Sequence, residues 1–102
     1  MSNILYANLP RFSTRQATRR LTVDATVGGV QFGAFTDDNN LVWFDVQDAD
    51  VMMTPEGTAP TTTVGHRLAA GEKYLTTVGN AKLMKFIRQG GTSGTIQYSE
   101  AS

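Results

Sequence analysis

The sequence contains no cysteine and only one histidine, His66. Without cysteine there is no disulfide and no thiolate ligand, and a zinc site needs three or four convergent ligands. The absence of thiols suits assembly in a reducing cytoplasm. We therefore expect no metal ion and no other cofactor, and we expect His66 to be an ordinary surface or loop residue.

Long hydrophobic segments are absent as well. No stretch approaches the ~20 apolar residues of a membrane-spanning helix, and the first residues have neither the basic leader nor the apolar run of a signal peptide. We expect a protein that is made in the cytoplasm and does not associate with a membrane. With 102 residues the chain has room for one domain with a modest core, which burial between copies of the chain would supplement.

The chain has no net charge, but its charges are divided into three blocks. Residues 1–23 carry four arginines and no acid, residues 24–56 carry seven acids and no base, and residues 57–102 carry five bases and two acids. Patches of opposite charge attract copies of the same chain or a complementary partner. We therefore expect a homo-oligomer that docks on a protein partner through charge-segregated surfaces.

The first twenty residues carry the strongest functional candidates. Pro10 interrupts regular structure because it lacks a backbone donor, and the residues after it place no apolar repeat on one face. We expect residues 1–20 to form an extended arm and residues 21–102 to form the folded domain. Arginine pairs with carboxylates through its planar fork and is enriched at interfaces. The predicted docking residues are Arg11, Phe12, Arg15, Arg19 and Arg20, with Phe12 as an apolar anchor.

Two other interpretations of the arginines remain open. The arm could be a solvated tail, or it could contact the phosphates of a nucleic acid. A nucleic-acid-binding protein usually carries a net basic charge and a recognisable module, whereas this chain is neutral. We therefore favour docking on protein and expect no direct contact with nucleic acid.

Composition and periodicity favour β-structure. Fourteen threonines, ten glycines and short apolar runs are typical of strands separated by tight turns. Alternating apolar residues predict strands over residues 21–27, 30–35, 41–46, 50–54, 74–78 and 95–99. The third of these is the most apolar and should be central. Segment 81–89 fits a helix or a strand, and we favour a strand.

The predicted connections complete this fold. Residues 37–40 should turn the second strand into the third as a meander. Residues 90–94 should close a hairpin onto the last strand, with Ile96 and Tyr98 facing inward. Seven or eight short strands favour an all-β fold, a small antiparallel β-sandwich or jelly-roll-like domain.

Carboxylates are the remaining candidates for chemistry. Paired acids serve glycoside hydrolysis and clustered oxygens hold calcium. The sequence Asp48-Ala49-Asp50 is not followed by the glycine of an EF-hand loop, and neither glycine pair is followed by the lysine of a phosphate-binding loop. We expect the acids to lie in solvated turns or on a docking face, and we expect the protein not to be an enzyme.

The aromatic residues allow a further alternative. Trp43, Phe44, Phe32 and Phe35 could line the sugar-binding surface of a carbohydrate-binding β-module. A domain of this size needs its large aromatic residues in the core. We therefore expect these four side chains to be core residues.

The second half of the chain, over roughly residues 41–99, resembles small virion proteins of tailed bacteriophages. In these proteins a strand of the kind DVxVT is followed by a glycine turn, an L-x-AG-E turn, an apolar strand that ends in IR and a closing GTS-x-x-I hairpin. The corresponding segments here are Asp50-Val51-Met52-Met53-Thr54; Gly57, Pro60 and Thr61; Leu68-Ala69-Ala70-Gly71-Glu72; Leu83 to Arg88; and Gly91-Thr92-Ser93-Gly94-Thr95-Ile96.

This resemblance implies a structural role in a phage particle. It implies a capsid cement or decoration protein that binds the major capsid protein in the virion and is assembled in the host cytoplasm. A component of the tail or of the head–tail connector is the alternative that the same resemblance leaves open. The family has no catalytic residues to place on this chain.

Overall fold

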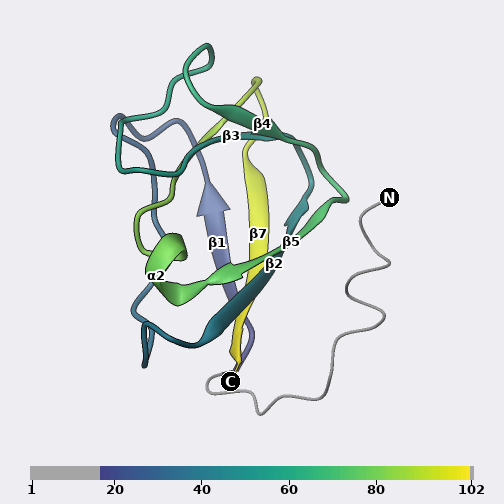
Figure 1. The fold of residues 1–102 in the computed structure, drawn as a ribbon. Helices are drawn as coiled ribbons and strands as arrows, with labels where there is room; N and C mark the ends of the chain where they lie inside the picture. Colours follow the sequence, from purple (N-terminus) through teal and green to yellow (C-terminus); the bar gives the residue numbers. More distant parts are fainter. Residues whose placement is uncertain (1–16, 102) are drawn as a thin grey trace.

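A computed structural model describes residues 17–101 of the chain, which are mostly β-structure (Figure 1). The elements are β1 (Arg19–Val23), β2 (Leu41–Gln47), β3 (Val51–Thr54), β4 (His66–Leu68), β5 (Lys73–Thr77), α2 (Val78–Ala81), β6 (Lys85–Arg88) and β7 (Gly94–Ala101). The strands form two antiparallel sheets, with the orders β1-β7-β2-β5 and β4-β3-β6. The prediction of an antiparallel, mostly β chain is confirmed.

Strand β2 shows how the sequence forms the larger sheet. Its apolar residues Val42, Phe44 and Val46 are buried, and they alternate with residues that face the other side. Successive side chains of a strand point to opposite faces, so one face of β2 enters the core, where each side chain contributes about 1.5–3 kcal/mol. β2 pairs with both β5 and β7. The prediction that it is a central strand is confirmed.

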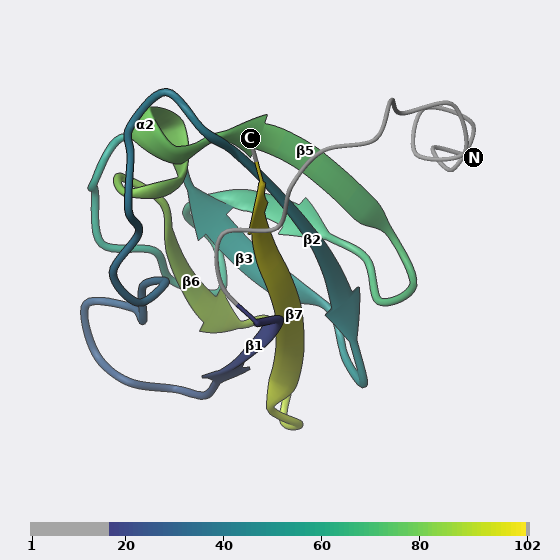
Figure 2. The ribbon, with the colours of Figure 1, turned by 90° about the horizontal axis from the view of Figure 1, so that it is seen from below.

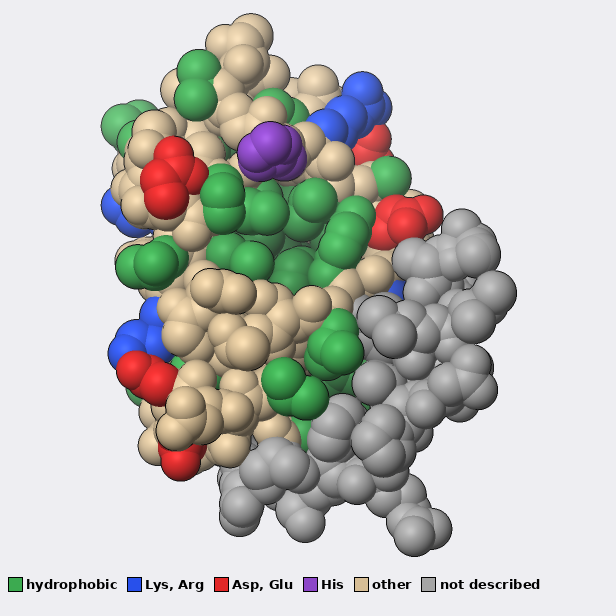
Figure 3. Space-filling model, in the orientation of Figure 1, with side chains coloured by type: hydrophobic (Ala, Val, Ile, Leu, Met, Phe, Trp, Pro, Cys, Tyr) green, Lys and Arg blue, Asp and Glu red, His purple; other side chains and the backbone are tan. Residues whose placement is uncertain are grey.

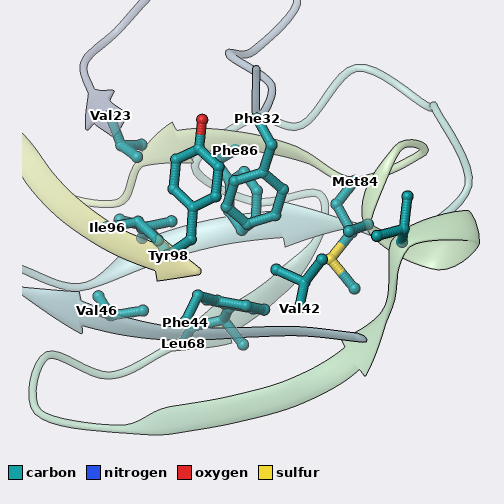
Figure 4. Close-up of a cluster of buried hydrophobic side chains, with 13 residues drawn as sticks. Val23, Phe32, Val42, Phe44, Val46, Leu68, Met84, Phe86, Ile96 and Tyr98 are labelled. Carbon is teal, nitrogen blue, oxygen red and sulfur yellow. The ribbon is translucent and has the colours of Figure 1, made fainter. Parts of the chain in front are cut away.

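The core takes residues from both sheets and from the helix (Figure 4). Phe86 and Ile96, from different sheets, are fully buried, and Tyr98 is 4% exposed. The inward orientation predicted for Ile96 and Tyr98 is confirmed. Phe32 adds a ring from the loop before β2, with its centroid 5.1 Å from that of Phe86. Edge-to-face pairs of this kind add about 0.5–1.5 kcal/mol beyond area burial.

The prediction of a strand over residues 30–35 is wrong. Only Val30 forms a bridge, with Phe86 of β6. The backbone that follows is held by side chains of β7, since the N–H of Gly33 donates to the Tyr98 hydroxyl at 2.8 Å. Both sides of β2 are already paired, one with β7 and the other with β5 (Figure 2). The meander from this segment into β2 therefore does not form.

The predicted hairpin over residues 90–94 is also wrong. β6 pairs with β3, whereas β7 pairs with β1 and β2, so the connection crosses from one sheet to the other. Gly94 permits the crossing. A Cβ atom there would lie 2.8 Å from the carbonyl oxygen of Ala49 and 2.8 Å from Cγ1 of Val51.

Only Ala81 of the ambiguous segment 81–89 is helical. A single helical turn, α2, ends at Ala81 and is capped by Thr77, whose hydroxyl accepts from the N–H of Asn80 at 3.2 Å. Strand β6 then begins at Lys85. The predicted strand is thus confirmed for its second half. β4, a strand of three residues, was not predicted.

Candidate functional site

The predicted docking residues fall into two groups. Arg11, Phe12 and Arg15 lie outside the described residues. Arg19 and Arg20 lie in β1, opposite Tyr98 and Gln97 of β7. Because β1 begins at Arg19, the last two residues of the predicted arm are part of the four-stranded sheet.

Arg19 packs against the folded domain. Its guanidinium carbon lies 4.7 Å from the ring centroid of Tyr98 and 5.3 Å from that of Phe35. Its Nη2 atom is buried and has no hydrogen-bond partner in the described structure. Gly33 leaves room for it, since a Cβ at that position would lie 3.0 Å from Nη1. Arg20 is exposed, so of the two arginines it is the one open to solvent.

Replacing Arg19 with serine is expected to lower the free energy of unfolding by roughly 1–2 kcal/mol, because two cation–π contacts and the packing of the side-chain stem are lost. Arg20→Ser removes the same charge from the next, exposed position and should change stability by less than about 0.5 kcal/mol. Urea unfolding followed by circular dichroism measures both values. Equal losses from the two variants would contradict a packing role for Arg19.

The acidic and basic blocks of the sequence meet in the folded structure. The Arg67 guanidinium donates to Asp50 Oδ2 through Nη2 at 2.6 Å and through Nε at 2.9 Å. Lys82 Nζ lies 2.9 Å from Asp38 Oδ1. Figure 3 shows acidic and basic side chains next to one another near the edges of the face drawn there. Two acids of the middle block are therefore balanced within the chain itself.

The Asp50 carboxylate accepts a backbone hydrogen bond in addition to its ion pair with Arg67. The backbone N–H of Ala70 donates to its other oxygen at 2.9 Å. This hydrogen bond, followed by those from Arg67, holds the pKa of Asp50 below its usual value. Arg67 is well exposed, and such surface pairs contribute little to stability. The arrangement fixes the connection between β4 and β5 and has no feature of a catalytic acid.

Glu100 is the one nearly fully buried charged residue within residues 17–101, with 1% of its surface exposed. Its carboxylate accepts hydrogen bonds from the turn before β2. The donors are the Thr36 N–H at 3.0 Å, the Thr36 hydroxyl at 2.6 Å, the Asp37 N–H at 3.2 Å and the Asn40 amide at 2.8 Å. Glu100 thus ties the end of β7 to the start of β2.

The environment of Glu100 has opposing effects on its pKa. Burial raises the pKa, but the hydrogen bonds from Thr36, from Asn40 and from the Asp37 N–H outweigh burial, so the pKa lies below its usual value. Hydrogen bonds to the charged form stabilise it. A buried carboxylate that stays ionised in this way is a structural anchor rather than a proton donor.

The outer face of the four-stranded sheet carries a hollow of about 190 Å³ beside Trp43. The expectation that all four aromatic residues are core residues is wrong for Trp43, which is 41% exposed, and it is confirmed for Phe32 and Phe44. Phe35 is half-buried. Residues that line the hollow include Thr18, Trp43, Asp45, Lys73, Gln97 and Ser99.

Strand pairing places the side chains of this hollow in two rows. Trp43 of β2 lies opposite Leu75 of β5 and Ser99 of β7, and Asp45 lies opposite Lys73 and Gln97. The Ser99 hydroxyl is 2.8 Å from that of Thr18. The sequence contained the signal for this face, because the period of two that buries Val42 and Phe44 turns Trp43 outward.

The described residues contain little else that could serve chemistry. Residues 17–101 hold no group of three or more histidine, cysteine or acidic side chains that could bind a metal ion. His66 is exposed on β4 and is visible in Figure 3, which confirms the prediction of a surface histidine. None of the helices in this part of the chain is long and apolar enough to cross a membrane.

Comparisons of the chain with protein-family models, with curated proteins and with solved structures gave no match. The fold and the site define a mostly β protein with a buried glutamate anchor, an exposed arginine on an edge strand and a hollow around a tryptophan. A function must therefore be argued from these residues and from the resemblance of residues 41–99.

Proposed function

We propose that this chain is a non-enzymatic structural protein of a tailed-phage virion, and that it binds and stabilises the capsid as a cement or decoration protein. We also propose that the fold is a β-sandwich or jelly-roll with an N-terminal arm. In this proposal the chain forms a homo-oligomer and binds the major capsid protein. It is located in the capsid after assembly in the host cytoplasm.

The observation that carries the proposal is where the segments of the resemblance lie. The first contains β3, the L-x-AG-E segment is the turn between β4 and β5, and the segment ending in IR contains β6. The turn glycines Gly57 and Gly71 adopt φ angles of +92° and +93°, a region that favours glycine. These segments coincide with strands and turns of the fold, whereas the closing GTS segment crosses between the two sheets instead of forming a hairpin.

The docking contact is proposed at β1 and the segment before it. β1 is an edge strand, and Arg20 is exposed on it. Arginine forms bidentate pairs with carboxylates, so an acidic surface of the capsid subunit is a suitable partner. Each contact is weak, but many identical contacts on one particle add avidity. Arg11, Phe12 and Arg15 extend this contact beyond the described residues.

The copy number of the chain in purified virions is the first test. Quantitative mass spectrometry gives this number relative to the major capsid protein. A ratio of the same order as the capsid subunit is expected for a cement or decoration protein. A small copy number, as for a single ring of subunits, would favour the tail or connector alternative. Absence of the chain from the particle would overturn the virion proposal.

A triple variant tests the docking surface without disturbing the packed arginine. The change Arg11→Ser, Arg15→Ser, Arg20→Ser is expected to weaken binding to particles that lack the protein at least about tenfold, since each lost charge contact is worth about 0.5–1 kcal/mol. Binding is measured by sedimentation of particles with increasing protein, and the unfolding midpoint should stay unchanged.

The matched control removes the same charge elsewhere. Lys82→Ser, Lys85→Ser and Arg88→Ser lie in or near β6, in the other sheet from β1. This control should bind particles as the native chain does. If the two triple variants saturate particles equally well, docking through the arginines is wrong.

A further inference from the structure

The hollow beside Trp43 combines a flat aromatic surface with hydrogen-bonding groups. Trp43 is 41% exposed although it lies on a central strand of the sheet. Beside it the Gln97 amide can both donate and accept, and Ser99, whose hydroxyl lies 2.8 Å from that of Thr18, also lines the hollow. Sites that bind small molecules share this composition, an apolar wall with a few convergent polar groups.

The two charged residues that line the hollow have opposite signs. Asp45 and Lys73 are directly opposite each other on β2 and β5. The Asp45 carboxylate is oriented by the Gln47 amide, which donates to Oδ2 at 2.7 Å. A cation would be attracted by Asp45 and by the indole ring but repelled by Lys73. An anion would be attracted by Lys73 but repelled by Asp45 and by the face of the indole ring. The hollow therefore favours a neutral ligand.

We propose that the Trp43 hollow binds one ring of a neutral glycan. A sugar ring offers an apolar C–H face, which suits the indole, and hydroxyl groups at its edge, which suit a carboxylate, an ammonium group and an amide. A volume of about 190 Å³ is below the range of pockets for drug-sized molecules and suits a single ring. This function goes beyond capsid binding. Because Arg20 lies opposite Gln97, the hollow and the proposed docking contact are neighbours on the same face of the sheet.

Titration with neutral trisaccharides tests the proposal directly. Trp43 is the only tryptophan of the chain, so its fluorescence reports on this hollow alone. The probes are maltotriose, cellotriose and triacetylchitotriose, with sialyllactose as an anionic comparison and a peptide of residues 1–16 as a basic one. At least one neutral trisaccharide should shift the emission with a dissociation constant on the order of 1 mM, as expected for few contacts.

Variants separate the hollow from the rest of the surface. Trp43→Ala should weaken binding at least about tenfold, as measured by calorimetry or by chemical-shift changes in nuclear magnetic resonance spectra. Gln97→Ala removes only an amide and should weaken binding about three- to tenfold. Leu83→Ala, at a position that is 52% exposed and not among the residues of the hollow, should leave binding unchanged.

Three results would overturn the proposal. The first is no emission change with any neutral trisaccharide up to about twenty times the expected dissociation constant, with the chain folded by circular dichroism. The second is tighter binding of sialyllactose or of the 1–16 peptide, which would assign the hollow to a charged ligand or to a segment of the chain. The third is that the Trp43→Ala and Gln97→Ala variants bind the trisaccharide as tightly as the native chain does. None of these depends on the copy number in virions, so the two proposals fail separately.

Discussion

Replacing Glu100 with alanine is expected to lower the free energy of unfolding by about 3–5 kcal/mol, because the buried Asn40 amide and the donors of Thr36 and Asp37 lose their shared acceptor. Small domains have a total stability of about 5–15 kcal/mol, so this single change removes a large part of it. The unfolding midpoint in a thermal scan should fall by more than about 12 °C.

Two further variants define the cause of this loss. Glu100→Gln keeps the size of the side chain but places an NH₂ group among donors, and it should lose about 2–3 kcal/mol. Glu56→Ala removes an exposed carboxylate and should change stability by less than about 0.5 kcal/mol. A Glu100→Ala variant as stable as the Glu56→Ala variant would show that the hydrogen bonds to the 36–40 turn do not stabilise the fold.

The same residue predicts a pH dependence with a definite sign. The folded pKa of Glu100 is lowered relative to the unfolded chain, so its contribution is present above the unfolded value of about 4.3. It is lost as the pH falls through the lower, folded pKa. Urea unfolding from pH 7 to pH 3 should therefore show a smaller acid-induced loss in Glu100→Gln than in the native chain. Parallel curves would contradict this assignment.

The second large effect is expected at Phe32. This loop residue is 9% exposed, and its ring contacts four others, those of Phe35, Phe44, Phe86 and Tyr98, at centroid distances of 4.5–5.9 Å. Phe32→Ala should cost about 3–5 kcal/mol, the range for a buried phenylalanine. Urea unfolding followed by circular dichroism measures the change.

A neighbouring phenylalanine gives the matched control for this prediction. Phe35 lies three residues further along the same loop and is only half-buried. Phe35→Ala should cost clearly less, about 1–2 kcal/mol, because less apolar area and fewer ring contacts are lost. If both variants lose the same stability, Phe32 is not the centre of the aromatic cluster.

The sequence predicted the strands whose side chains alternate within one sheet. β2 and β7 followed from the period of two, and β3 was found within one residue of its start. Residues 30–35 show the same alternation but form a loop. Tyr98 binds the N–H of Gly33, and Glu100 binds the N–H of Thr36 just after the segment, and both partners are more than sixty residues away. The local periodicity of a sequence carries no information about such long-range contacts.

The candidate site was harder to predict for a similar reason. Trp43 was assigned to the core by its size, although its position in the alternation placed it on the other face. The blocks of charge suggested separate patches, but the contact of Asp50 with Arg67 depends on how β3 pairs with β4. The sequence pattern gives no sign that Arg19 stacks on Phe35 and Tyr98, because this is a tertiary contact. Arg19 therefore resembled the other arginines and was predicted to dock.

The position of β7 has a consequence for protein synthesis. β1 pairs only with β7 in the described structure, and β7 also completes the pairing of β2. The ribosome makes about 5–20 residues per second, so β1 waits roughly 4–14 s for its partner. A chain whose translation stops before residue 94 cannot build the four-stranded sheet. Prematurely terminated copies therefore lack the surface that carries both Trp43 and Arg20.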